Sequence, residues 1–145
     1  MIDSIPAGLW EWFFDCAKIT RLFFNFSDGT NDATAIAPAG DTVLDDYIDG
    51  SQRRQYAFEL IRFVPVSTEA NDTSNIEMLE EVENIREWVE NQNNAGSLPQ
   101  MPEGRYAESI EVPETQTGYV AMVDQNTAKY MIPFILTYTR SDKNV

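Results

Sequence analysis

The closing segment of the chain, residues 128–140, constrains the fold more than any other stretch. Its sequence, AKYMIPFILTYTR, alternates strictly and so places large apolar side chains on one face, namely Tyr130, Ile132, Phe134, Leu136 and Tyr138. The alternation predicts a long core strand. Because Pro133 has no N–H to donate to a β-ladder, we expect it at a sheet edge or a bulge.

The N-terminal residues predict a short helix over residues 5–17. Ser4 can cap this helix, and apolar side chains recur along it at helical spacing, with Trp10 beside the stripe and Trp12 widening it. We expect the helix to pack on its own sheet. The alternative is that part of it, including Trp10 and Trp12, docks on a neighbouring subunit. The only cysteine, Cys16, is interpreted as a small packed residue.

A second, longer helix is predicted from residue 74 to a stop at Gly96. Ser74 and Glu77 have the spacing of a capping box, and glycine is common just beyond a helix C-terminus. The apolar stripe consists of Met78, Val82, Ile85 and Val89, broadened by Leu79 and Trp88. The other side is predicted to be a solvated acidic face made of Glu80, Glu81, Glu83, Glu87 and Glu90.

The remaining segments predict strands joined without crossover helices. Residues 18–27 are expected as a half-buried strand and residues 28–41 as a loop with a short strand near Ile36. Residues 106–112 and 118–123 precede the closing strand. The order α, β, β, β, α, β, β, β favours an α+β fold, with a mainly antiparallel sheet of about five or six strands and two helices packed on one face. At 145 residues, the chain is expected to be one domain over residues 1–145.

The sequence DDYIDGSQRRQY, which begins at Asp45, predicts a hairpin. An Asp-Gly pair between β-like runs is typical of a two-residue type I′ turn. With Asp49 and Gly50 at the tip, Asp46 faces Arg53 and Asp45 faces Arg54 across the ladder. A three-residue loop would instead leave Arg54 opposite Asp46.

The two arginines admit a second interpretation. Arg53 and Arg54 can extend past the tip to carboxylates on another copy of this acidic chain, which bidentate guanidinium groups bind well. The candidate subunit-interface residues are therefore Arg53, Arg54, Asp45, Asp46, Trp10 and Trp12.

Composition excludes several classes of function. The formal net charge of −14 repels nucleic-acid phosphate, so sequence-specific DNA or RNA binding is not expected. The chain has no histidine, the usual general base and the commonest zinc ligand, and it has no phosphate-binding glycine motif. We expect no enzymatic activity, no catalytic residues, no cofactor and no metal site. Without a basic n-region or a long apolar run, the chain is expected to be soluble inside the cell that makes it, with no membrane partner.

The order and motifs of the chain resemble a family of small structural proteins of tailed bacteriophages. The segments that carry the resemblance are YIDGSQRRQYAFEL, NIEMLEEVENIREWVENQNNAGSLP and AKYMIPFILTYTR. The most specific positions are Tyr47, Asp49, Gly50, Ser51 and Arg54, then Trp88 followed by GSLP, and Tyr130 with the closing FILTY. The family comprises tail-terminator or minor capsid proteins of siphophages that infect Gram-positive bacteria.

The resemblance implies a structural role in the virion. Such proteins assemble as a homo-oligomeric ring, typically six-fold, on the head-proximal end of the tail tube, where they end tail polymerisation and join tail to head. The expected partners are other copies of the chain, the major tail tube protein and a head-completion protein. DNA would only pass through the bore, which an acidic chain suits because like charges repel. The expected location is the virion, and the host cytoplasm during assembly.

Two alternatives stay open. Within the virion, the chain could be a head-completion or connector protein, or a minor capsid protein. From a different class, it could be a cytoplasmic small-ligand-binding α+β module, which should contain a closed apolar pocket.

Overall fold

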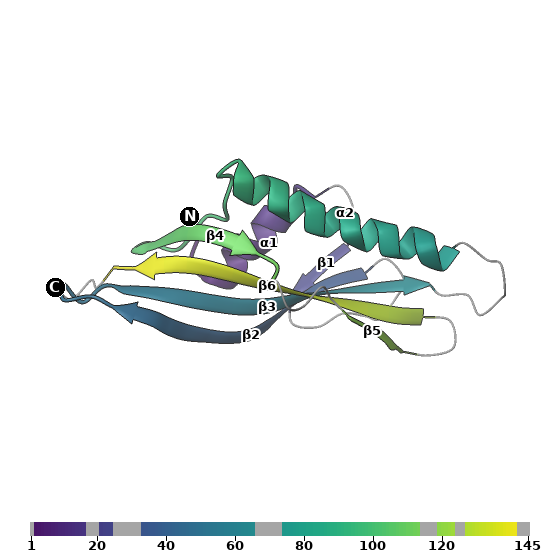
Figure 1. Ribbon diagram of the computed structural model, residues 1–145, viewed down its shortest axis with the longest axis horizontal. Helices are drawn as coiled ribbons and strands as arrows, with labels where there is room; N and C mark the ends of the chain where they lie inside the picture. Colours follow the sequence, from purple (N-terminus) through teal and green to yellow (C-terminus); the bar gives the residue numbers. More distant parts are fainter. Residues whose placement is uncertain are drawn as a thin grey trace.

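The computed structural model describes residues 2–16, 21–24, 33–65, 74–113, 119–123 and 127–141. The elements follow the predicted order of helices and strands (Figure 1). Their bounds are α1 (Ile5–Phe13), β1 (Arg21–Phe24), β2 (Ala33–Asp46), β3 (Gln52–Pro65), α2 (Ser74–Asn94), β4 (Arg105–Glu111), β5 (Tyr119–Met122) and β6 (Thr127–Arg140).

The strands form one sheet in the order β1-β2-β3-β6-β4. The short strand β5 also pairs with β6, along the first part of β6, whereas β4 pairs with the last part. The four strands β2, β3, β6 and β4 are antiparallel, whereas β1 runs parallel to β2. The α+β class is therefore confirmed. The expected five or six strands slightly exceed the four of the antiparallel sheet, and the sheet has six strands when β1 and β5 are included.

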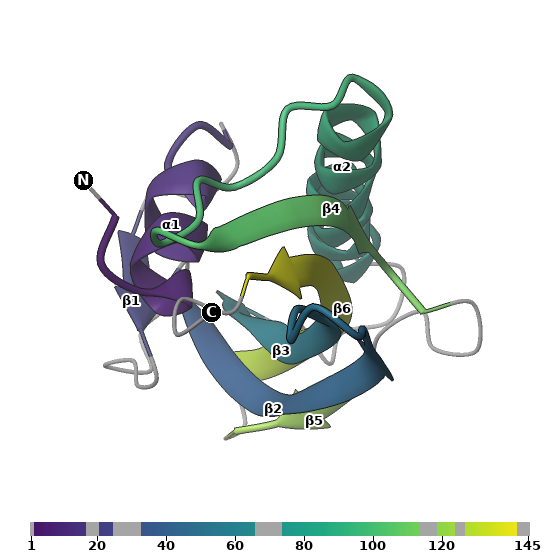
Figure 2. The same ribbon diagram turned by 90° about the vertical axis from the view of Figure 1, so that its left-hand side faces the viewer.

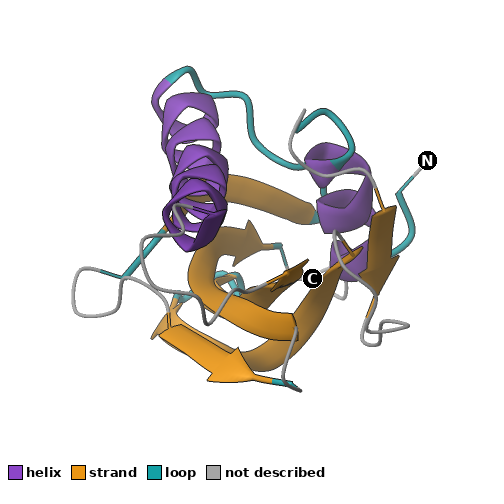
Figure 3. Ribbon diagram, turned by 90° about the vertical axis from the view of Figure 1, so that its right-hand side faces the viewer, coloured by secondary structure: helices purple, strands orange, loops and turns teal. Residues whose placement is uncertain are grey.

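Both helices lie on the same side of the curled sheet, as the two end-on views show (Figures 2 and 3). The sheet face beneath them carries the even-numbered apolar residues of β3 and β6, whose alternation was predicted for β6. Phe13 of α1 lies 6.1 Å from the rings of both Phe58 and Phe134, measured between ring centroids. Val82, Ile85 and Val89 of α2 complete the same core.

Pro133 lies in a central strand and not in an edge strand. It pairs with Glu59 of β3 on one side. On its other side, β5 pairs with residues 128–131 of β6 and β4 pairs with residues 135–140. Pro133 therefore lies between the part of β6 that pairs with β5 and the part that pairs with β4. At this point neither described strand needs a backbone N–H from β6, so a proline fits.

Helix α1 begins as predicted and ends earlier than predicted. The Ala7 backbone N–H donates to the Ser4 hydroxyl at 3.2 Å, which confirms the cap. The helix ends at Phe13, and a turn then leads to Cys16, which is buried, as expected of a small packed residue. The expectation that the helix continues to residue 17 was wrong, and residue 17 itself lies outside the described residues.

Gly8 fixes how closely α1 approaches the segment that follows α2. A Cβ atom added to Gly8 would lie only 2.0 Å from the backbone oxygen of Gln100. Backbone atoms cannot rotate away as a flexible side chain can, so the helix must move if this position carries a side chain. The contact explains why a glycine occupies the middle of a packed helix.

Replacing Gly8 with alanine is expected to lower the free energy of unfolding by about 1–3 kcal/mol, because the extra methyl group forces α1 away from Gln100. The matched control is Gly40→Ala, since a Cβ at Gly40 meets nothing within 4 Å, and this change should stay within about 0.5 kcal/mol of the wild type. Urea unfolding of both variants measures the difference. Equal stability of the two variants would show that the close approach does not constrain the fold.

Helix α2 confirms most of its predicted pattern. Val82, Ile85 and Val89 are buried, Trp88 is half-buried against the core, and the chain leaves the helix at Gly96 with a φ of 74°. The side chain of Met78 lies outside the described residues. Leu79 was expected to broaden the apolar stripe but is 44% exposed.

Glu81 was wrongly placed on the solvated face. Its carboxylate accepts a hydrogen bond and forms an ion pair with Nη2 of Arg62, a residue only 2% exposed on β3. Arg62 also donates from Nη1 to the Thr34 hydroxyl at 3.0 Å. The helical periodicity of the acids could not reveal this pair, because the cation comes from a distant strand.

Two segments near the start of the sheet differ from expectation. Of the strand predicted for residues 18–27, only Arg21–Phe24 is described, as β1. Residues 33–41 were expected as a loop with only a short strand near Ile36, but all of them belong to β2; residues 28–32 lie outside the described residues. Ile36 and Ala35 are buried, so tertiary contacts override the weak strand propensity of this small-residue stretch.

Candidate subunit interface

The hairpin between β2 and β3 ends in a three-residue loop. Tyr47 and Ser51 are joined by a backbone hydrogen bond of 2.9 Å, the Gly50 N–H donates to the Tyr47 carbonyl at 3.0 Å, and Gly50 has a φ of 90°. A glycine with positive φ after such a turn makes a bulge. The expected two-residue type I′ turn was therefore wrong.

The observed register also differs from both predicted registers. Asp45 lies opposite Arg53 and Asp46 lies opposite Gln52, and a bulge before Asp45 then places Val43 opposite Arg54. Neither predicted acid–base pairing across the ladder was right, because Arg53 faces Asp45 and not Asp46, and Arg54 faces no acid. An Asp-Gly pair favours tight turns generally, but the sequence alone did not reveal the extra loop residue or the bulge.

The turn is held by local hydrogen bonds. The Ser51 backbone N–H donates to the Asp49 carboxylate at 2.9 Å, and the Ser51 hydroxyl donates to the same oxygen. These side-chain and backbone hydrogen bonds hold the pKa of Asp49 below its ordinary value. The hairpin tip is thus a defined turn and not an irregular loop.

Arg53 lies between two carboxylates on the exposed side of the sheet. Its Nη1 is 3.7 Å from Asp45 and its Nε is 3.4 Å from Glu108 of β4. Glu108 also accepts a hydrogen bond of 2.8 Å from the Thr139 hydroxyl. All of these side chains are well exposed, so each ion pair contributes little to stability, about 0.2–1 kcal/mol.

Arg54 belongs to a half-buried polar cluster that the sequence did not predict. Its Nε donates to Asp41 at 3.2 Å, its Nη1 donates to Gln52 at 2.7 Å, and only 16% of its side chain is exposed. Gln52 in turn donates to Asp46 at 2.8 Å. Arg54 and Asp46 thus have partners within their own chain. Asp41 was missed because a bulge at residue 39 brings it to the helix-covered face opposite Tyr56.

Two tyrosines complete the cluster. The Tyr138 hydroxyl donates to Asp41 at 3.0 and 3.1 Å. Burial, followed by the hydrogen bond and the negative charge of Asp41, raises the pKa of Tyr138 above its ordinary value. Burial and the charge of Asp41 likewise raise the pKa of Tyr56. For Arg54, burial opposes the charged form, but the hydrogen bond and charge of Asp41 outweigh it and raise the pKa.

The raised tyrosine pKa values predict a loss of stability at alkaline pH. The folded chain holds these two protons more tightly than the unfolded chain, so their contribution is complete below the ordinary pKa of 10.0 and is lost as pH rises through the higher folded values. Urea unfolding at about pH 9 and about pH 11 should show the loss, and Tyr138→Phe and Tyr56→Phe should each reduce it. An unchanged loss in both variants would contradict this assignment.

The end of the hairpin exposes several large apolar side chains. Val43 and Leu44 are more than 40% exposed, Tyr47 is 47% exposed, and Ile48 in the loop is fully exposed. Tyr106, near the same end on β4, is also exposed. We call the segment from Val43 to Ser51 the arm. Exposed apolar residues gathered on a well-defined hairpin indicate a contact surface more than a catalytic site.

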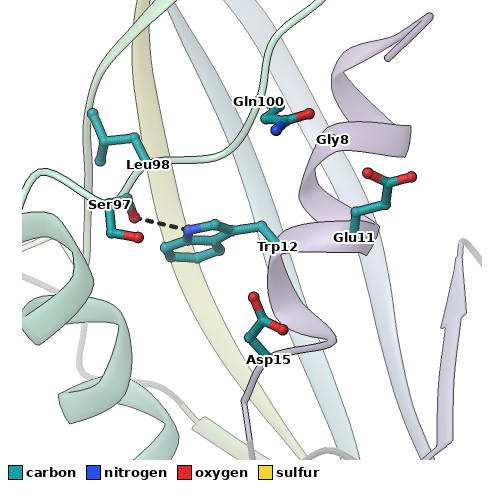
Figure 4. A pocket seen from close by; sticks show the side chains of 7 residues that line it. All are labelled: Gly8, Glu11, Trp12, Asp15, Ser97, Leu98 and Gln100. Atoms are coloured by element: carbon teal, nitrogen blue, oxygen red, sulfur yellow. Dashed lines mark hydrogen bonds between the residues drawn. The ribbon is translucent and has the colours of Figure 1, made fainter. Parts of the chain in front are cut away.

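The two tryptophans of α1 have different environments. Trp10 is 36% exposed and its ring lies 4.2 Å from that of Phe14, which is 54% exposed, so this aromatic pair remains available to a partner. Trp12 is buried, and its indole N–H donates to the Ser97 carbonyl at 2.9 Å (Figure 4). This burial within its own core argues against Trp12 as an interface residue.

A hollow of about 270 Å³ lies beside Trp12, between α1 and residues 97–100 (Figure 4). Its wall includes the carboxylates of Glu11 and Asp15 and the backbone at Gly8. It is not the closed apolar pocket expected of a small-ligand-binding module. Across the described ranges, no group of three or more carboxylate or thiol side chains is placed to hold a metal ion. The helices within those ranges include none with the length and hydropathy needed to cross a membrane.

Comparison with known proteins adds no assignment: no family model matches the chain, and no curated protein matches its sequence.

Proposed function

We propose that this chain is a structural protein of a tailed-phage virion. In this role it forms a homo-oligomeric ring at the head-proximal end of the tail tube, ends tail polymerisation and joins tail to head. The ring is typically six-fold in the family that the sequence resembles.

The observation that carries the proposal is the arm. It is a hairpin held by its own hydrogen bonds, and it carries exposed apolar residues that include Tyr47 and Ile48. Subunits that assemble need surfaces of this kind, which combine a defined backbone with apolar side chains that lose contact with water on association. The exposed pair of Trp10 and Phe14 offers a second such surface on α1.

The charge of the chain supports the same role. With a net charge of −14, a ring of these subunits would repel DNA passing through its bore and would not retain it. The absence of histidine is also more consistent with a structural role than with acid–base catalysis.

Electron microscopy of particles from a phage that lacks this gene tests the proposal. Overlong tails without heads are expected, because nothing would stop the tube or join it to the capsid. Tails of normal length joined to heads would refute the proposal. Normal-length tails that fail to join filled heads would instead favour a head-completion or connector protein.

A further inference from the structure

Two arginines lie side by side at the arm end of the sheet. Arg105 of β4 and Arg140 of β6 are direct cross-strand partners, next to Gln52 of β3. Like charges placed opposite each other destabilise a sheet. Neither side chain forms an ion pair or hydrogen bond with any residue that the structure describes, and Arg140 is exposed. We call this pair the arginine corner.

The carboxylates of the neighbouring arm do not neutralise the arginine corner. Each aspartate of the arm already has a partner in the same hairpin. Asp45 forms an ion pair with Arg53, Asp46 accepts a hydrogen bond from Gln52, and Asp49 accepts one from Ser51. Asp41 is occupied by Arg54 and Tyr138. The corner is therefore able to bind carboxylates that come from outside its own hairpin.

The exposed side of α2 offers a complementary surface. It carries a row of carboxylates without a described partner, at Glu77, Glu80, Glu83, Glu87 and Glu90. Its first turns also expose two apolar side chains, Ile76 at 58% and Leu79 at 44%. Apolar residues beside acids on one helix match the arm end, where Tyr47 and Ile48 lie at the same end of the sheet as the arginines.

The two surfaces lie at opposite ends of the molecule. The arm, the start of β4 and the end of β6 are at one end of the long axis, whereas α2 begins at the other end (Figure 1). Within one copy, the arginine corner therefore cannot reach the first turns of α2, but in a second copy it can. A contact between two different surfaces of identical subunits is heterologous, and it closes into a ring when the rotation between neighbours permits.

We propose that copies of this chain associate head to tail, with the arginine corner and arm of one copy bound to the first half of α2 on the next. The contact pairs Arg105 and Arg140 with Glu80 and Glu83, while Tyr47 and Ile48 cover Ile76 and Leu79. This inference rests on the proposed self-assembly and specifies the surfaces that form it.

A charge-swap experiment tests the contact. Arg105→Glu with Arg140→Glu reverses the corner, and Glu80→Arg with Glu83→Arg reverses the helix. Each double variant is expected to weaken self-association at least about tenfold, because like charges then face each other across the contact. The quadruple variant restores opposite charges and keeps the net charge at −14, so it should recover association. Native mass spectrometry over a concentration series measures all four proteins.

Control variants separate the contact from general charge effects. Lys129→Glu and Glu111→Arg reverse charges outside the arginine corner, the arm and both helices, and should leave association unchanged. Circular dichroism establishes that each variant is folded, and the exposed single change Arg140→Glu replaces the double variant if that variant does not fold.

The outcomes distinguish this inference from the proposed function. If wild-type chains stay monomeric over the whole concentration series, if the reversed corner does not weaken their association, or if the quadruple variant fails to recover it, this contact is wrong while the ring role stands. If the contact is upheld but deleting the gene leaves tails normal and joined to heads, the proposed function is wrong and the association serves another purpose.

Discussion

Replacing Phe13 with alanine is expected to lower the free energy of unfolding by about 3–5 kcal/mol. The side chain is fully buried, and its ring lies 6.1 Å from Phe58, 6.1 Å from Phe134 and 6.0 Å from Trp88, measured between centroids. Phe13 thus joins α1 to the sheet and to α2 at one point. Its truncation leaves a cavity among aromatic rings that cannot all move inward.

The neighbouring residue provides a matched control. Phe14 has the same side chain on the same helix terminus but is 54% exposed, so Phe14→Ala should change stability by no more than about 0.5 kcal/mol. Urea unfolding of both variants at one pH gives the comparison. Similar losses from the two substitutions would contradict the packing of α1 described above. Because Phe14 belongs to an exposed aromatic pair, its replacement also reports whether that pair contributes to association.

Replacing Glu81 with alanine is expected to lower the free energy of unfolding by about 3 kcal/mol. The change removes the carboxylate that forms an ion pair with Arg62, and that pair lies largely out of water because Arg62 is only 2% exposed. Glu81 itself is 23% exposed at its side chain, which places the expected loss at the lower end of the range for buried ion pairs.

A second variant separates the cost of removing one partner from the net contribution of the ion pair to the free energy of unfolding. Arg62→Met together with Glu81→Leu removes both charges and keeps much of the volume, so most of the lost stability should return. Chemical denaturation of the single and double variants measures this. A double variant that is less stable than Glu81→Ala would mean that the ion pair stabilises the fold beyond neutralising a buried charge.

The sequence predicted the parts of the fold that depend on local periodicity. The alternation of residues 128–140 identified β6 and the residues on its buried face, and the spacing of Val82, Ile85 and Val89 identified the buried side of α2. In both cases the position of a residue in the repeat predicts whether its side chain is buried. Ser4 as a cap is equally local, since its hydroxyl bonds a backbone group three residues away.

The predictions were wrong where the local structure depends on residues far away in the sequence, or on the exact length of a turn and the position of a bulge. Residues 33–41 have weak strand propensity, and they form a strand because β3 pairs with them. Glu81 looks like any exposed helix acid until the fold places Arg62 beside it. The observed hairpin register differs from the predicted one because one extra loop residue and a bulge shift every pair. Arg54 therefore forms its ion pair with Asp41 and not with Asp45.

The candidate interface was predicted in part. The structure leaves Arg53 and Trp10 exposed, whereas Trp12 is buried and Arg54 is largely covered within its own chain. The apolar arm was not predicted as a surface, although its exposed residues are visible in the sequence, because strand alternation does not tell which part of a hairpin extends beyond the helices. Arg105 and Arg140 come together only through the pairing of β4 with β6.

Electron microscopy of the protein mixed with purified tail tubes tests the central claim most directly. The tubes supply the surface on which the ring is proposed to form, so a monomer in dilute buffer does not affect the result. The account predicts a closed ring of identical subunits at one end of each tube, six in the arrangement typical of the family that the sequence resembles. Tube ends that remain bare at saturating protein would contradict it.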